Sequence, residues 1–294
     1  MRRRVWWITT LFFLVVGVNC SEGADSPLLD KIRSATTYIF IKSGGTFVPR
    51  GTGFFVGLRI PTKPKSFFLY LVTTKHLLYQ PGTSQFIDTI YIRLNKKGGG
   101  SELAAIPVKT QGANRTVFVH SDPTVDLVVM PGMPDQTRFD FKFITDEFFL
   151  PQEAGNLLKY YEGIEVFYPS LFFLYAGAGG NHPFFRYGRF ALIPEEKIMW
   201  EGKLTTLYLI ETNGFPGENS GAPVFFFWES GNPPGSQSLL KLAGIIQGSF
   251  IDQSAITRNR SAIPFSNEGI AAMIPATKLY ELLFSDEVRR QRGF

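Results

Sequence analysis

Residues 217–224 read GENSGAPV, and this stretch is the starting point for predicting the fold. Ser220 lies among small residues directly before an apolar run, which predicts a tight turn that leads into a β-strand. A nucleophilic serine needs such a turn, because the turn exposes the hydroxyl and aims backbone N–H groups at a developing oxyanion. The same pattern also occurs in ordinary hairpins, so by itself it leaves both interpretations open.

Two further stretches carry groups that could serve a nucleophilic serine. The run LVTTKHL at 71–77 brings an apolar strand to His76, one of three histidines in the chain, and a histidine there can act as a general base. The run VDLVVM at 125–130 places Asp126 at the start of another strand, where its carboxylate can orient a histidine. Each has a structural alternative, which is an interfacial histidine with a satisfied hydrogen bond or a turn-forming aspartate.

The order of these residues along the chain is His76, Asp126, Ser220, which is the order of chymotrypsin-type proteases. On these motifs the chain resembles the trypsin-like serine peptidase family, in particular its secreted, disulfide-free bacterial V8-type and HtrA-type branch. Further stretches that resemble the family lie at 51–56, 242–246 and 269–275. The resemblance implies that His76 is the base, Asp126 the orienting carboxylate and Ser220 the nucleophile. It implies no cofactor and no metal.

The resemblance also assigns the oxyanion hole, to the backbone N–H groups of Glu218 and Ser220. The family usually has glycine where Glu218 stands, so this position departs from the pattern. Asn219 stands where trypsin has the aspartate that pairs with a new N-terminus after zymogen cleavage. An asparagine cannot form that ion pair, so we expect activity without N-terminal processing near residues 34–39.

The same resemblance places the specificity pocket between two segments. Its floor falls at Gly214 and Phe215, and its edge lies on the strand at Gln247, Gly248 and Ser249. The floor has no acid to select Arg or Lys, and the strand has no histidine to select glutamate. We therefore expect an apolar pocket and cleavage after small or medium uncharged residues such as Val, Ala or Leu.

Short β-branched or aromatic runs, separated by Gly and Pro, predict strands along most of the chain. The first set lies at 37–42, 51–57, 67–74, 86–95, 103–109 and 116–120. The second set lies at 163–168, 187–193, 204–211, 222–228, 239–249 and 269–274. Helices are predicted over 26–34 and 276–290. The expected fold is all-β, with two packed antiparallel six-stranded β-barrels (chymotrypsin-like) and a C-terminal helix.

The 294 residues divide into three predicted segments. Residues 1–20 read as a signal peptide, with three arginines, an apolar run and a cleavage site after Cys20. Residues 21–145 form the N-terminal barrel half, and residues 146–294 form the C-terminal half with its helix. We expect export to the periplasm or the medium, the alternative being a membrane tether by an uncleaved signal. No later stretch reaches the roughly 18 apolar residues of a membrane span.

Composition narrows the function classes. Hydrophobic residues make up 44% and charged residues 19%, which excludes wholesale disorder. Without the arginines at 2–4 the chain has 27 basic and 25 acidic residues, so no nucleic-acid partner is expected. Cys20 is the only cysteine, which excludes disulfides and cysteine zinc sites. The glycine-rich run at 177–182 lacks the third glycine of a dinucleotide loop.

The expected function is an exported serine endopeptidase that hydrolyses protein or peptide substrates through an acyl-enzyme intermediate. Three alternatives stay open. The protease fold could have lost its chemistry and become a binding module, for which Glu218 at the oxyanion-hole position is the motive. The cleft could serve esters. The histidine and the aspartate could also be incidental in an unrelated β-sandwich.

Overall fold

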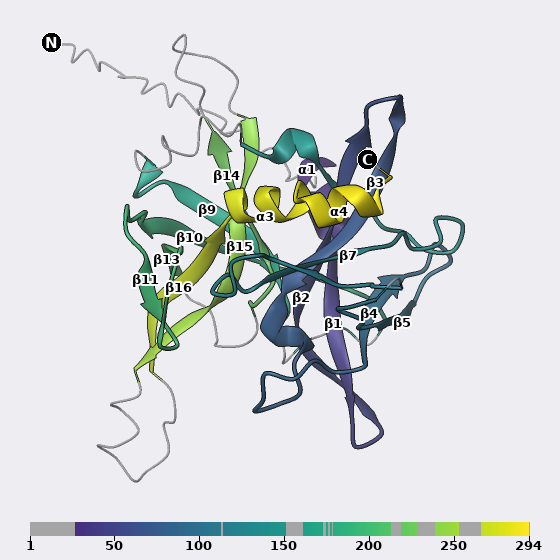
Figure 1. The fold of residues 1–294 in the computed structure, drawn as a ribbon, viewed down its shortest axis with the longest axis horizontal. Helices are drawn as coiled ribbons and strands as arrows, with labels where there is room; N and C mark the ends of the chain where they lie inside the picture. Colours follow the sequence, from purple (N-terminus) through teal and green to yellow (C-terminus); the bar gives the residue numbers. More distant parts are fainter. Residues whose placement is uncertain are drawn as a thin grey trace, which may run out of the picture.

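The computed structural model describes residues 27–112, 114–150, 161–172, 175, 177, 179–212, 219–228, 239–252 and 266–293. Two β-structures lie side by side, one from each half of the chain (Figure 1). Short helices near the C-terminus run across the two halves, and the last of them ends beside the N-terminal sheet. The predicted all-β class with a C-terminal helical segment is confirmed.

The N-terminal sheet has eight strands. They are β1 Thr36–Ser43, β2 Thr46–Ile60, β3 Lys63–Thr74, β4 Thr89–Asn95, β5 Ser101–Pro107, β6 Phe118–Val119, β7 Leu127–Pro131 and β8 Ile144–Thr145. The strand order is β5-β4-β1-β2-β3-β7-β6, and β8 pairs with β2 in parallel. The antiparallel pairing of β3 with β7 matters most for the site, because it brings the ends of two sequence motifs together.

The C-terminal half is a closed six-stranded barrel in the order β10-β13-β16-β15-β14-β9. Its strands are β9 Glu165–Ser170, β10 Phe184–Leu192, β13 Tyr208–Thr212, β14 Pro223–Trp228, β15 Leu239–Asp252 and β16 Ser266–Pro275. A separate hairpin of β11 (Ile198–Trp200) and β12 (Lys203–Thr205) follows β10 and precedes β13 in the sequence, outside the barrel. Closure leaves this half without a free strand edge in the barrel.

Helices flank the two halves at both ends of the described chain. Helix α1 (Pro27–Ala35) leads into β1, and α3 (Ala276–Leu283) follows β16 directly. One apolar core joins the sheet, the barrel and the C-terminal helices. It includes Val56, Tyr70 and Val72 from the first half, Phe225, Leu242 and Ile245 from the second, and Leu279, Leu282 and Val288 from the helices. The two halves therefore share a packed interface that holds them in one arrangement.

The structure differs from the sequence prediction in three details. The N-terminal half has eight strands, and no hydrogen-bonded pairing closes it within the described residues, where six strands in a barrel were expected. The predicted helix 276–290 is two helices, α3 and α4 (Asp286–Gln291); Ser285, with an extended backbone, separates them, and two acidic residues occupy the first turn of α4. The predicted strand 204–211 is divided between β12 and β13.

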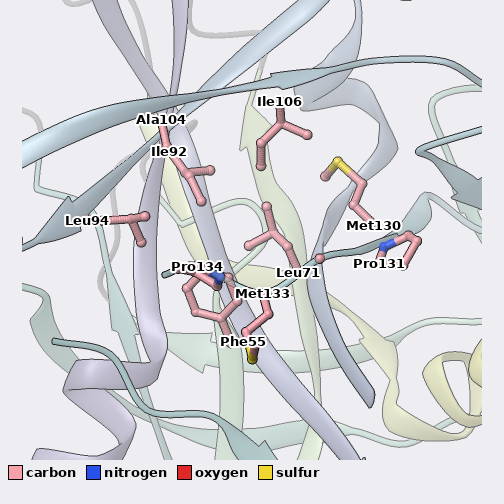
Figure 2. Close-up of a pocket in the computed structure, with 11 residues that line it drawn as sticks. Phe55, Leu71, Ile92, Leu94, Ala104, Ile106, Met130, Pro131, Met133 and Pro134 are labelled. Carbon is pink, nitrogen blue, oxygen red and sulfur yellow. The ribbon is translucent and has the colours of Figure 1, made fainter. Parts of the chain in front are cut away.

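An apolar cavity of about 190 Å³ is lined by residues of β2, β3, β4, β5 and β7 and by the segment that follows β7 (Figure 2). Its lining consists of Phe55, Leu71, Ile92, Leu94, Ala104, Ile106, Met130, Pro131, Gly132, Met133 and Pro134. No polar side chain lines it, so the cavity offers no group for chemistry.

None of the helices in the described residues is long and apolar enough to cross a bilayer.

Candidate active site

The pairing of β3 with β7 brings His76 and Asp126 together. Thr74, the last residue of β3, is opposite Leu127, the first residue of β7. His76 lies two residues beyond Thr74, in the 3₁₀ turn η1 (Lys75–Leu78), and Asp126 lies one residue before Leu127. The two motifs therefore meet at one end of the sheet, although they are 50 residues apart in the sequence.

Asp126 contacts the histidine through both carboxylate oxygens. Its Oδ2 lies 2.5 Å from His76 Nδ1, and its Oδ1 accepts a hydrogen bond of 2.9 Å from the His76 backbone N–H. The Asp126 side chain is 13% exposed and the His76 side chain 40% exposed. The two contacts fix both the ring and its backbone, and with Nδ1 engaged the remaining ring nitrogen is Nε2.

The Ser220 turn is held against β2 and β15 by backbone hydrogen bonds. The Thr52 N–H donates to the Ser220 carbonyl at 2.9 Å, and the Gly221 N–H donates to the Ile246 carbonyl at 2.8 Å. Gly221 has a φ of +84°, which a residue with a side chain rarely adopts. Within the described residues, none of the turn's hydrogen bonds uses the Ser220 N–H.

Gly51 lies between the histidine turn and the serine turn. A Cβ added at Gly51 would stand 2.6 Å from Leu77 Cδ1 and 2.9 Å from the Ser220 carbonyl oxygen. Only a residue without a side chain permits this close approach. The structure therefore brings His76, Asp126 and Ser220 to one region at the interface of the two halves.

The Ser220 hydroxyl is hydrogen-bonded to a backbone carbonyl. Its Oγ donates to the Gln247 carbonyl at 3.0 Å, and the residue is only 3% exposed. No hydrogen bond between Ser220 and His76 is found in the part of the chain that the structure describes. Catalytic hydrogen bonds are often long or misaligned before substrate binds, so this geometry is compatible with a catalytic and with a structural serine.

Two buried amide side chains adjoin the serine with unpaired atoms. Asn219 is 1% exposed, and among the residues that the structure describes neither its Nδ2 nor its Oδ1 has a hydrogen-bond partner, nor does Oε1 of Gln247. The Asn219 side chain therefore carries no ion pair, in keeping with its uncharged amide. Buried unpaired polar atoms are uncommon in folded proteins and are expected to acquire partners from water or substrate.

The predicted pocket is covered by the described residues only in part. Gln247, Gly248 and Ser249 lie on β15, as expected, whereas Gly214, Phe215 and Glu218 fall outside the described residues. The oxyanion hole through Glu218 and the floor of the pocket thus stay predictions. The sequence analysis missed Trp200, whose ring carbon Cζ2 would lie 3.0 Å from a Cβ at Gly248. Its only signal was a short apolar run that ends in tryptophan.

Lys75, next to the histidine, is partly buried by the same packing. Burial lowers its pKa below the ordinary value of 10.5, and the nearby Asp126 carboxylate opposes that shift. Its Nζ donates to the Pro123 carbonyl at 3.2 Å and to the Val125 carbonyl at 3.4 Å.

No group of three or more His, Cys, Asp or Glu residues able to hold a metal occurs among the described residues.

The architecture of a closed six-stranded barrel, a second mainly antiparallel sheet and C-terminal helices is consistent with a chymotrypsin-like double-barrel fold. No protein-family model matches the chain, and no curated protein matches it. Similar solved structures include the apo MamO protease domain from Magnetospirillum magneticum, with 14% identity and a TM-score of 0.48. That match covers 86% of this chain and 97% of that chain.

Another similar structure is catalytically active tobacco etch virus protease complexed with product, with 14% identity and a TM-score of 0.44. The match covers 88% of this chain and 80% of that chain. At these identities and TM-scores, neither likeness supports an inference about activity, which must come from the residues of this chain.

Proposed function

We propose that the protein is a trypsin-like serine endopeptidase with Ser220 as nucleophile, His76 as general base and Asp126 as the orienting carboxylate. The observation that carries this proposal is the double contact of Asp126 with His76, at 2.5 Å to the ring and 2.9 Å to the backbone. A buried carboxylate on Nδ1 selects the tautomer in which Nε2 can take a proton, and it stabilises the imidazolium that then forms.

In the proposed mechanism, the Ser220 hydroxyl leaves the Gln247 carbonyl and turns to His76 Nε2 when substrate binds. Ser220 Oγ attacks the scissile carbonyl carbon while its proton passes to Nε2. The tetrahedral intermediate collapses as His76 protonates the leaving amine, and water then hydrolyses the acyl-enzyme by the same proton route. The backbone N–H groups of Ser220 and Glu218 are the proposed oxyanion donors, each worth about 3–4 kcal/mol where it is in place.

The proposal extends to substrate and location. Cleavage after small or medium uncharged residues is proposed, with Gln247, Gly248 and Ser249 at the pocket edge. The V8-type and HtrA-type branch, the signal peptide over 1–20 and export from the cytoplasm are proposed on the sequence motifs alone. Protein or peptide is the proposed substrate class, and no cofactor enters the mechanism.

A second candidate function is a protease-fold binding module with weak or absent catalysis. The observation in its favour is the Ser220 hydroxyl, which is 3% exposed and donates to the Gln247 carbonyl. The presence of a glutamate at position 218 also favours a binding module, because a carboxylate turned toward the oxyanion would repel it.

A peptide-library digest with the wild type and Ser220→Ala separates these functions. The endopeptidase predicts cleavage by the wild type, mainly after Val, Ala or Leu, and none by the folded variant. Cleavage by Ser220→Ala at the wild-type rate would contradict the assignment of the nucleophile. Predominant cleavage after Arg, Lys or Glu would contradict the proposed apolar specificity pocket and leave the catalytic assignment untouched. No cleavage by a folded wild type would favour the binding module.

A further inference from the structure

The loop over residues 121–126, which ends in Asp126, is fastened by side chains along its length. Lys75 Nζ donates to the carbonyls of Pro123 and Val125, and the Lys75 backbone N–H donates to the Asp126 carbonyl at 3.3 Å. Between them, the Thr124 carbonyl accepts from Thr205 Oγ1 of the β11–β12 hairpin at 3.0 Å. The four consecutive carbonyls from residue 123 to residue 126 are therefore held by donors outside the loop.

The other side of this loop rests on a buried histidine that the proposed mechanism does not use. The His120 side chain is 3% exposed. Its Nδ1 accepts a hydrogen bond of 3.0 Å from the Asp122 N–H, and its Nε2 lies 3.2 Å from Oε2 of Glu281 on α3. His120 thus connects the start of the loop to a helix of the C-terminal half.

These two contacts define the form of the His120 ring. A nitrogen that accepts from a backbone N–H carries no proton, so Nε2 holds the single ring proton and donates it to the Glu281 carboxylate. Burial lowers the pKa of His120 below 6.5, while the Glu281 carboxylate opposes this shift. The neutral ring therefore makes one hydrogen bond with each nitrogen, which is its full capacity.

The hydrogen bond between the Asp122 N–H and His120 is connected to Asp126 by a short turn that closes on itself. The Asp122 carbonyl accepts from the Val125 N–H at 3.1 Å, and Asp122 Oδ1 accepts from the N–H and the hydroxyl of Thr124. The backbone from 122 to 125 therefore moves as a unit, and Asp126 follows it directly. A displacement at the Asp122 N–H would shift the carboxylate that holds His76.

We propose that neutral His120 is a positioning residue for Asp126, joining helix α3 to the loop that carries the orienting carboxylate. The inference rests on the proposed function, because it assigns His120 a part in setting the rate of that same site. His120 touches neither substrate nor His76, and its effect passes wholly through Asp126. A shift of about 1 Å at a catalytic group can cost about 100-fold in rate.

The test measures kcat and KM on a peptide that the wild type cleaves, with active sites titrated, for His120→Leu and His120→Asn. Leucine removes both hydrogen bonds, whereas the asparagine oxygen can still accept from the Asp122 N–H. We expect His120→Leu to lower kcat by about 10- to 100-fold with little change in KM, and His120→Asn to recover only part of the loss, because it keeps the Asp122 contact and loses the one to Glu281. Unchanged kcat in folded His120→Leu would overturn the proposal.

A double-mutant cycle separates positioning from general stability. In an Asp126→Asn background, followed by the rate of fluorophosphonate labelling, His120→Leu should cause no further loss, because its route to the site is already removed. If His120→Leu slows labelling by the same factor in both backgrounds, the proposal is overturned. If His120→Leu does not fold, Glu281→Ala takes its place in the cycle, with Lys278→Ala beside it as the control, because Glu281 also pairs with Lys278 at 2.9 Å.

Glu287→Ala is the matched control. Glu287 lies on α4 and pairs at 2.9 Å with Arg115, which lies between β5 and β6, so its loss also removes a contact between a C-terminal helix and the N-terminal half. It has no contact with the loop at 121–126, and kcat should be unchanged. If Ser220→Ala hydrolyses the peptide, the proposed function is wrong. If Ser220→Ala is inactive but the His120 variants keep full activity, only the positioning role is wrong.

Discussion

Gly221→Ala tests whether the backbone of the serine turn, and not just its hydroxyl, sets the activity. Gly221 has a φ of +84°, which costs an L-residue with a side chain about 1–2 kcal/mol. The added Cβ would also lie well inside contact distance of the Thr52 carbonyl oxygen and 2.6 Å from Thr73 Oγ1. Both neighbours are buried and hydrogen-bonded to each other at 2.7 Å, so neither can move aside freely.

The expected magnitude follows from that geometry. A non-bonded carbon needs roughly 3.5 Å, so the turn must move by more than about 1 Å, and overpacking of this kind adds about 1–3 kcal/mol. Gly221→Ala should therefore lose about 2–5 kcal/mol of unfolding free energy. The same displacement moves Ser220 relative to His76, and we expect about 100-fold slower hydrolysis per titrated active site.

Gly163→Ala is the matched control for this change. Its φ is +83°, almost the same as at Gly221, but nothing lies within 4 Å of the added Cβ. Urea unfolding should show a loss of about 1–2 kcal/mol in the control, and its activity should equal the wild type. Equal unfolding free energies and equal rates for the two variants would refute the reasoning about the close approach of Gly221 to β2.

Three further predictions follow from the site. Asp126→Asn should lower kcat by about 10,000-fold with the fold intact, measured by peptide hydrolysis and circular dichroism; a loss below about tenfold would contradict the role of Asp126. Because burial lowers the pKa of His120, the unfolded chain binds the proton more readily than the native one. The free energy of unfolding should therefore fall as pH drops below 6.5, and urea titrations should show a shallower decline for His120→Asn. A chain expressed from Ser21 should be active without trimming near residues 34–39, because Asn219 forms no ion pair; activity that appears only after trimming would contradict this.

Much of the fold could be predicted from the sequence because its strands are long enough to carry a pattern. The runs at 67–74 and 222–228 are apolar and β-branched or aromatic, and both are strands in the structure. Strand β6 lies within the predicted run 116–120, and β7 is the apolar run that follows Asp126, which adds to the set of six. No pattern indicates β8, because its two residues are too short to show any periodicity and its pairing with β2 depends on a neighbour elsewhere in the chain.

The candidate site was predictable where it depended on strand ends and unpredictable where it depended on distant contacts. His76 and Asp126 each adjoin a recognisable apolar strand, and the pairing of those strands brings them together. The role of His120 depends on Glu281, which lies 161 residues away on a helix that no local pattern relates to it. The resting position of Ser220 depends on the Gln247 carbonyl, and side-chain patterns carry no information about a backbone carbonyl.

The central claim, that Ser220 is a nucleophile activated by His76, is tested most directly by covalent trapping. The folded wild type is incubated with a serine-directed fluorophosphonate, and intact mass and peptide mapping locate the adduct. Ser220→Ala and His76→Ala are treated in parallel. The mechanism predicts one adduct on Ser220 in the wild type, none in Ser220→Ala and strongly slowed labelling in His76→Ala. A folded wild type that stays unlabelled, or that labels equally fast without His76, would contradict it.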